Sequence, residues 1–190
     1  MDKERKIEYR FLKEIRAAND TDKMIVEGVA VRFGVANVLW TDSNGKEYKE
    51  IVAKGAFDNC VMDDVLLRYN HDDSVPVLAN TKNKTLELTV TDEELRVRAE
   101  LANTSVGRDV FELVKAGTVG GLSIAFYADE DDCDYMGTTR TINKVTRLIE
   151  ISIVDHPAYQ ETSVEAVRSM ERTKREKQEK RKRLILRTYL

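Results

Sequence analysis

Between residues 24 and 154 the chain repeats one pattern: short runs of β-branched and aromatic residues that end at turn signals. Asn44-Gly45 is a strong hairpin signal between two such runs, and Thr91–Glu94 lies between two alternating runs that predict a second hairpin. The expected strands cover residues 24–33, 38–40, 47–52, 64–71, 85–90, 95–101, 121–128 and 147–154. Strands with one apolar face must pair and pack, so the pattern predicts a sheet-based fold.

One helix pattern interrupts these strands. Thr104 or Ser105 can cap its start, and Gly117 stops it at a position that favours glycine. Its apolar stripe consists of Val106, Val110, Leu113 and Val114. We therefore expect an α+β, mainly β fold, namely a closed or nearly closed, mostly antiparallel β-barrel with a few surrounding helices.

Composition excludes several classes of protein. The 190 residues include 42% hydrophobic ones, too many for a disordered chain, and no apolar run approaches the roughly 20 residues needed to cross a membrane. The charged N-terminus predicts no secretory signal. Cys60 and Cys133 stand 73 positions apart without a CxxC partner, which argues against disulfides or a zinc site and fits a reducing cytosol. We expect no metal, no cofactor and no membrane partner.

Charge divides the chain after Met170. Residues 171–190 hold nine Lys and Arg against three Glu, a local charge of +6, which leaves 22 basic and 31 acidic residues, a charge of −9, in residues 1–170. We expect one domain over residues 1–170 and a basic helical or flexible extension over 171–190. A basic run can bind nucleic acid, but we favour a solvated linker-like helix and expect no nucleic-acid partner.

The only histidines are His71 and His156, so a histidine base must be one of these two. His71 ends an expected strand in "LLRYNHDD", where an imidazole can face a cleft. Taken alone, the position favours a solvated loop histidine.

Ser123 lies in "GTVGGLSIAF", where it shares one strand face with Ala125. A hydroxyl among small residues suits a nucleophile, and the amides of Gly120 and Gly121 could bind an oxyanion. The alternative is a serine on the polar face of an amphipathic strand, and the GxSxG elbow of α/β-hydrolases is absent.

Glu150 stands out in "RLIEISIV", where Leu148, Glu150, Ser152 and Val154 are expected on one face and isoleucines on the other. Both faces are largely apolar, so we expect a central strand with a partly buried carboxylate that needs an imidazolium or arginine partner. The structural alternative is a salt bridge to Arg147 or Arg98.

Two other patterns carry less. The acidic stretch 128–137 fails the EF-hand spacing, because its fifth and sixth positions would be Cys133 and Asp134, and we expect a solvated acidic loop. Cys60 has no neighbouring histidine and is expected to be a buried structural thiol.

Five motifs in order resemble the prohead (head-maturation) serine proteases of tailed bacteriophages, over roughly Ile25 to Val167. They are "EIVAKGAFDNCV", "VLLRYNHD", "TLELTVTDEELRVRAEL", "TSVGRDVFELVKAGTVGGLSIAF" and "RLIEISIVDHPAYQETSVEAV". The resemblance implies a fold like the herpesvirus assemblin proteases and a catalytic set of Ser123, His71 and Glu150. Assemblin relatives use a second histidine as third member, so His156 competes with Glu150. Oxyanion donors would include Gly120, Gly121 or an arginine such as Arg140 or Arg147.

The function implied is a serine endopeptidase that cleaves the major capsid protein, its scaffold region and itself, in the host cytoplasm inside the assembling prohead. A homo-oligomer is compatible with this. The alternative is a catalytically silent capsid assembly or scaffold factor that acts through its basic tail. A hydrolase of small esters is disfavoured, because no elbow or lid-like insert is present.

Overall fold

The structure is a computed structural model that describes residues 7–12, 14–18, 23–129 and 133–155. Its strands form three sheets. The first, called the site sheet below, has the order β1 (Glu8–Leu12), β10 (Gly121–Tyr127), β13 (Arg147–Val154), β6 (Leu66–Tyr69) and β7 (Ala79–Asn80). The second has the order β2 (Ile15–Ala17), β3 (Ile25–Arg32), β9 (Glu94–Glu100) and β8 (Leu86–Val90). The third has the order β11 (Cys133–Met136), β12 (Thr139–Ile142), β5 (Glu47–Val52) and β4 (Ala36–Thr41).

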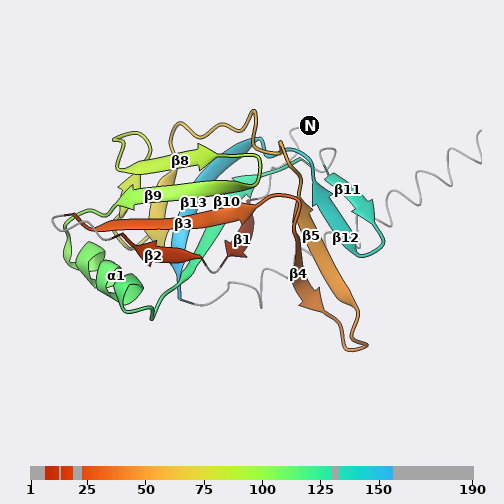
Figure 1. Cartoon of the computed structure of the whole chain (residues 1–190), viewed down its shortest axis with the longest axis horizontal. Coiled ribbons are helices and arrows are strands. Elements are labelled where there is room, and N and C mark those ends of the chain that lie inside the picture. The colour runs from red at the N-terminus through yellow and green to blue at the C-terminus, as the bar shows by residue number, and fades with distance from the viewer. Residues whose placement is uncertain (1–6, 13, 19–22, 130–132, 156–190) are drawn as a thin grey trace, which may run out of the picture.

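The first two sheets pack against each other. Figure 1 shows β2, β3, β9 and β8 in front of β1, β10 and β13, with the hairpins β4–β5 and β11–β12 to one side, and β3 contacts both β1 and β10. Leu122, Ile124 and Phe126 of β10 are completely buried in the core. The approach is close, because a Cβ on Gly28 of β3 would lie 2.9 Å from Leu122 Cδ1. This layered packing holds the strand that carries Ser123 against the core.

The predicted helix is confirmed as α1 (Ser105–Lys115), which contacts β2 and β3. The Thr104 hydroxyl accepts a hydrogen bond from the Gly107 amide and caps the first turn. Gly117 has a φ of 71°, and its amide donates to Val114 O while the Thr118 amide donates to Leu113 O. This Schellman ending is available because glycine carries no Cβ penalty in the left-handed region.

The expected class is confirmed but the barrel is not. The fold is mainly β with one helix, where a few were expected, and none of the three sheets closes on itself within the described residues. Most strand pairs are antiparallel, as predicted. The exceptions are β12 with β5 and β13 with β6, which are parallel. Sheet closure depends on such pairings between distant segments, which local alternation does not specify.

The hairpins at Asn44-Gly45 and at Thr91–Glu94 are confirmed as β4–β5 and β8–β9. The prediction of a solvated acidic loop over residues 128–137 is wrong for Cys133–Met136. These residues form strand β11, which pairs with β12. Five strands were not predicted: β1, β2, β7, β11 and β12. In the described part of the chain no helix is long and apolar enough to cross a membrane.

Candidate active site

The candidate site lies where β6 and β13 run side by side in parallel. After β6 the chain turns sharply. Asn70 and His71 have φ values of 52° and 57°, and the Asp72 amide donates to Tyr69 O over 3.1 Å. Two successive left-handed residues closed by this hydrogen bond are the signature of a type I′ turn. Asparagine and histidine tolerate that region better than most residues, so the sequence "YNHD" can make the turn.

The turn is tied to the end of β13. The Asn70 amide donates to Ile153 O over 3.0 Å, and the Asp155 amide donates to Asn70 Oδ1 over 3.2 Å. Left-handed backbone at non-glycine residues persists only where its surroundings hold it, and it concentrates at functional sites. The effect here is to fix His71 beside the strands that carry Ser123 and Glu150.

Strand register brings the other two residues onto the same face of the site sheet. Ser123 of β10 lies opposite Ser152 of β13, and Ala125 lies opposite Glu150. Cross-strand partners share a face, so Ser123 and Glu150 occupy neighbouring rows. The register shifts between Ala125 and Phe126, which puts Leu148 opposite Phe126 and into the core. The expectation that Leu148 shares a face with Glu150 is therefore wrong, because of this β-bulge.

The three side chains form one chain of hydrogen bonds. His71 Nδ1 lies 2.5 Å from Glu150 Oε1, and His71 Nε2 lies 2.7 Å from Ser123 Oγ. An ionised carboxylate can only accept, so Nδ1 carries the proton and donates it to Glu150. In this tautomer the lone pair is on Nε2, which accepts a hydrogen bond from the Ser123 hydroxyl. Ser123 is completely buried, while the His71 and Glu150 side chains keep 15% and 12% of their surface exposed.

Glu150 is held in its charged form. Burial raises its pKa, but hydrogen bonds from His71 and Ser152 and the charges of His71 and Arg68 outweigh burial and bring the pKa below its ordinary value. The Ser152 hydroxyl donates to Glu150 Oε1 over 2.6 Å, and Arg68 Nε lies 3.4 Å from Oε2. The expected buried carboxylate in a central strand is thus present, with both an imidazole and an arginine beside it.

The alternative partners proposed for Glu150 are engaged elsewhere. Arg98 pairs with Glu27 on the second sheet, and Arg147 lies 3.9 Å from Asp63. Arg140, also considered as an oxyanion donor, is buried in an ion cluster with Glu8 and Glu50.

Strand β1 forms one side of the site. Tyr9 meets the His71 ring edge-on, with ring centroids 4.6 Å apart and an interplanar angle of 74°. Burial and then the Glu150 charge raise the Tyr9 pKa, so its phenol stays neutral. Phe11 lies opposite Ser123 in the register, and a Cβ on Gly121 would lie only 2.1 Å from the Phe11 ring. Gly121 therefore makes room for this ring, while the oxyanion role of Gly120 and Gly121 remains a prediction.

Cys60 is only partly buried, where a buried thiol was expected. Burial raises the pKa of Cys60 to about 11, so it holds almost no thiolate at neutral pH. Cys133 is buried, and burial also raises its pKa. His156 and the basic extension 171–190 lie outside the described residues. Among the residues that the structure does describe, no cluster of His, Cys, Asp and Glu has the arrangement of a metal site.

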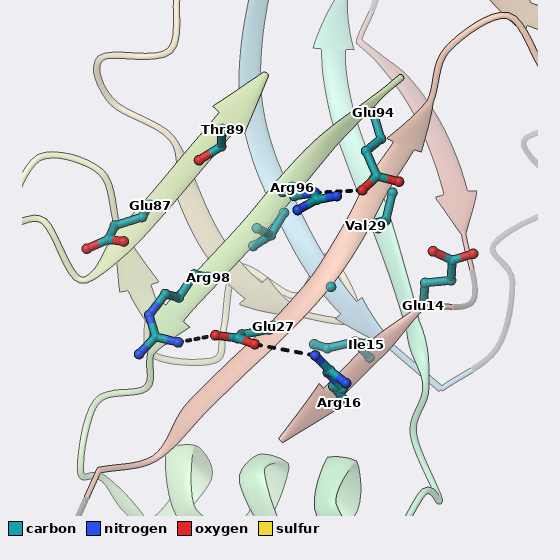
Figure 2. A pocket seen from close by; sticks show the side chains of 12 residues that line it. Glu14, Ile15, Arg16, Glu27, Val29, Glu87, Thr89, Glu94, Arg96 and Arg98 are labelled. Atoms are coloured by element: carbon teal, nitrogen blue, oxygen red, sulfur yellow. Dashed lines mark hydrogen bonds and ion pairs between the residues drawn. The ribbon is translucent and has the colours of Figure 1, made fainter. Parts of the chain in front are cut away.

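A separate hollow of about 620 Å³ lies on the outer face of the second sheet. Figure 2 shows its charged side chains largely paired with one another: Glu27 lies between Arg98 and Arg16, and Glu94 contacts Arg96. Ser123, His71 and Glu150 are not among its lining residues. Paired charges of this kind make a solvated sheet face and offer no catalytic set.

Sequence reasoning missed Ser152, Arg68 and Tyr9. Ser152 had a signal, because it was expected on the same face as Glu150 in an otherwise apolar strand. Arg68 stands three residues before His71, but only the parallel pairing of β6 with β13 brings it to Glu150. Tyr9 lies in an N-terminal segment that reads simply as charged.

A serine hydroxyl, an imidazole and a carboxylate in hydrogen-bonded series are the constellation of serine hydrolases. Residues 13–176 match the family described as the caudovirus prohead serine protease, and the chain belongs to that family. It is 29% identical over 163 residues to the prohead protease of Enterobacteria phage HK97, a match that covers 83% of this chain and 66% of that relative. This chain thus spans slightly under two thirds of the relative's length. The solved structure of the bacteriophage T4 capsid assembly protease aligns with a TM-score of 0.48 and 12% identity, covering 77% of this chain and 98% of that one.

Proposed function

We propose that this protein is a serine endopeptidase that cleaves capsid and scaffold proteins, and itself, inside the assembling phage prohead. The observation that carries the proposal is the hydrogen-bonded series of Ser123, His71 and Glu150. Membership of a serine protease family supports it. The name of the HK97 relative supports the setting in the prohead.

The proposed roles follow from the proton positions. His71 Nε2 takes the Ser123 proton as the hydroxyl oxygen attacks a peptide carbonyl, and it returns that proton to the leaving amine. Glu150 holds the Nδ1–H tautomer and stabilises the imidazolium that forms. Backbone amides beside Ser123, with Gly120 and Gly121 as candidates, would bind the oxyanion. Water then releases the acyl group by the same steps.

The test is co-expression of the full chain with its own major capsid protein. We expect a shortened capsid band with the natural sequence and none with Ser123→Ala, since loss of the nucleophile can cost about six orders of magnitude in turnover. Ser105→Ala is the matched control, because Ser105 is exposed at the start of α1. Normal processing by the Ser123→Ala chain would overturn the proposal and leave the silent assembly factor.

A further inference from the structure

We propose that Ser152 is a positioning residue that holds His71 and Glu150 together, an inference that rests on the proposed function. Ser152 lies in β13, between β10 and β6, and is completely buried. Its register neighbours are Ser123 on β10 and Arg68 on β6. The Ser152 hydroxyl therefore lies on the central strand of the site sheet. The neighbouring strand on one side carries Ser123, and the neighbouring strand on the other side leads into His71.

The hydroxyl of Ser152 is committed on both sides. It donates to Glu150 Oε1 over 2.6 Å and accepts the backbone N–H of His71 over 3.1 Å. A hydroxyl has one donor, so the donor is used by Glu150 and a lone pair by His71. The same group thus bridges the carboxylate of the proposed third member and the backbone of the proposed base.

Each of these bonds acts on a feature that needs support. His71 stands in the left-handed region, at a φ of 57°, where a non-glycine residue relies on its surroundings. Glu150 Oε1 receives both the Ser152 hydroxyl and His71 Nδ1, so Ser152 sets the rotation at which the carboxylate meets the imidazole. Displacement of about 1 Å in a catalytic group can lower the rate about a hundredfold.

Arg68 has a different part. Its Nε lies 3.4 Å from Glu150 Oε2, the other carboxylate oxygen, and its Nη2 lies 3.1 Å from the exposed Asp73. Arg68 supplies positive charge near Glu150 but no bond to the His71 backbone. Arg68 Nη1 also donates to Asp72 O over 3.4 Å, so Arg68 contacts the turn, but of the two residues only Ser152 bonds both Glu150 Oε1 and the His71 amide.

The experiment compares Ser152→Ala with Ile151→Val in the full chain. Ile151 is buried in the same strand and belongs to the core, so its truncation weakens β13 without touching these hydrogen bonds. We expect Ser152→Ala to lower kcat about tenfold to a hundredfold with KM nearly unchanged, and Ile151→Val to leave both nearly unchanged. Ser152→Cys keeps the side-chain size but hydrogen-bonds weakly, and it gives the same comparison if the alanine chain does not fold.

A second measurement is independent of activity. The chain has only two histidines, so ¹⁵N NMR of the imidazole nitrogens resolves His71 once His156→Gln assigns the other signal. We expect the fraction of His71 in the Nδ1–H tautomer to fall in the Ser152 variants and to stay unchanged in Ile151→Val. An unchanged His71 spectrum and kcat in the Ser152 variants would overturn this inference while leaving the endopeptidase proposal standing. Absence of cleavage by the natural chain would overturn the endopeptidase proposal, and the NMR comparison would still decide the role of Ser152.

Discussion

The backbone conformation of His71 is unfavourable for a non-glycine residue, but it places the imidazole beside Ser123. Its left-handed backbone departs from the extended path of β6, and the turn carries the imidazole to Ser123 Oγ. Asn70 is also left-handed, and it anchors the turn because its amide donates to Ile153 O and its Oδ1 accepts from the Asp155 amide. Without this anchoring, His71 would relax toward an ordinary backbone conformation, and its imidazole would move away from Ser123.

Two substitutions test which residue is the third member of the proposed catalytic set. Glu150→Gln keeps the shape but removes the charge beside His71, and an analogous change in a known triad costs about 10⁴ in rate. We expect a loss of that order in peptide cleavage for Glu150→Gln and a much milder change for His156→Gln. Full loss in His156→Gln with an active Glu150→Gln would assign the role to the histidine.

At the residue scale, the sequence predicted the three central residues of the candidate site but not the residues that contact them, Ser152 and Arg68. His71, Ser123 and Glu150 were singled out by their positions at strand ends and faces and by family resemblance, and the structure brings them together. The contacts of Ser152 with His71 and of Arg68 with Glu150 cross from β13 to β6 and its turn, and no local pattern encodes them. Their roles depend on a parallel pairing between segments about 80 residues apart.

Strand β1 was not predicted, because its charged residues suggest a solvated segment although they are largely buried in the fold. Glu8 and Arg10 belong to an ion cluster, while Tyr9 and Phe11 lie on the side of the candidate site. Arg10 contacts Glu50, Arg140 contacts both Glu8 and Glu50, and Arg10 also lies over the Phe126 ring. The segment looks solvated in sequence because these charges find further partners on β5 and β12, which lie in another sheet.

The ion cluster should therefore hold β1 in place. We expect Glu50→Gln to lower the free energy of unfolding by about 3–5 kcal/mol, because Arg10 and Arg140 would stay buried with less opposing charge. Urea denaturation followed by circular dichroism measures this.

Glu100→Gln is the control for that measurement. Its carboxylate pairs with Lys23 at the surface, and such a pair contributes about 0–1 kcal/mol. Equal effects of the two substitutions would mean that the buried cluster adds no more than a surface pair.

For the whole molecule, buried carboxylates set the response to acid. Burial raises the pKa of Glu8, but hydrogen bonds and charge from Arg140 and Arg10 outweigh burial and hold it below its ordinary 4.5. Glu150 is lowered in the same way. A carboxyl with a lower pKa in the folded state stabilises the fold above its unfolded pKa, and this stabilisation disappears as pH falls through the folded pKa.

We expect the free energy of unfolding to change little from these groups above about pH 5 and to fall steeply below about pH 4.5. Urea midpoints measured across this range test the expectation. Glu8→Gln should be less stable at neutral pH and show a shallower loss in acid. A natural chain whose stability stays constant between about pH 5 and pH 3 would contradict it.

The position of β13 has a consequence for when the candidate site can form during synthesis. β13 is the last strand of the described chain, yet it lies between β10 and β6 and carries Glu150. Until residues 147–154 have been synthesised, β10 and β6 have no strand to join them and His71 has no carboxylate partner. The hydrogen-bonded series of Ser123, His71 and Glu150 can therefore form only after β13 has been synthesised, and a chain cut short before residue 147 lacks it.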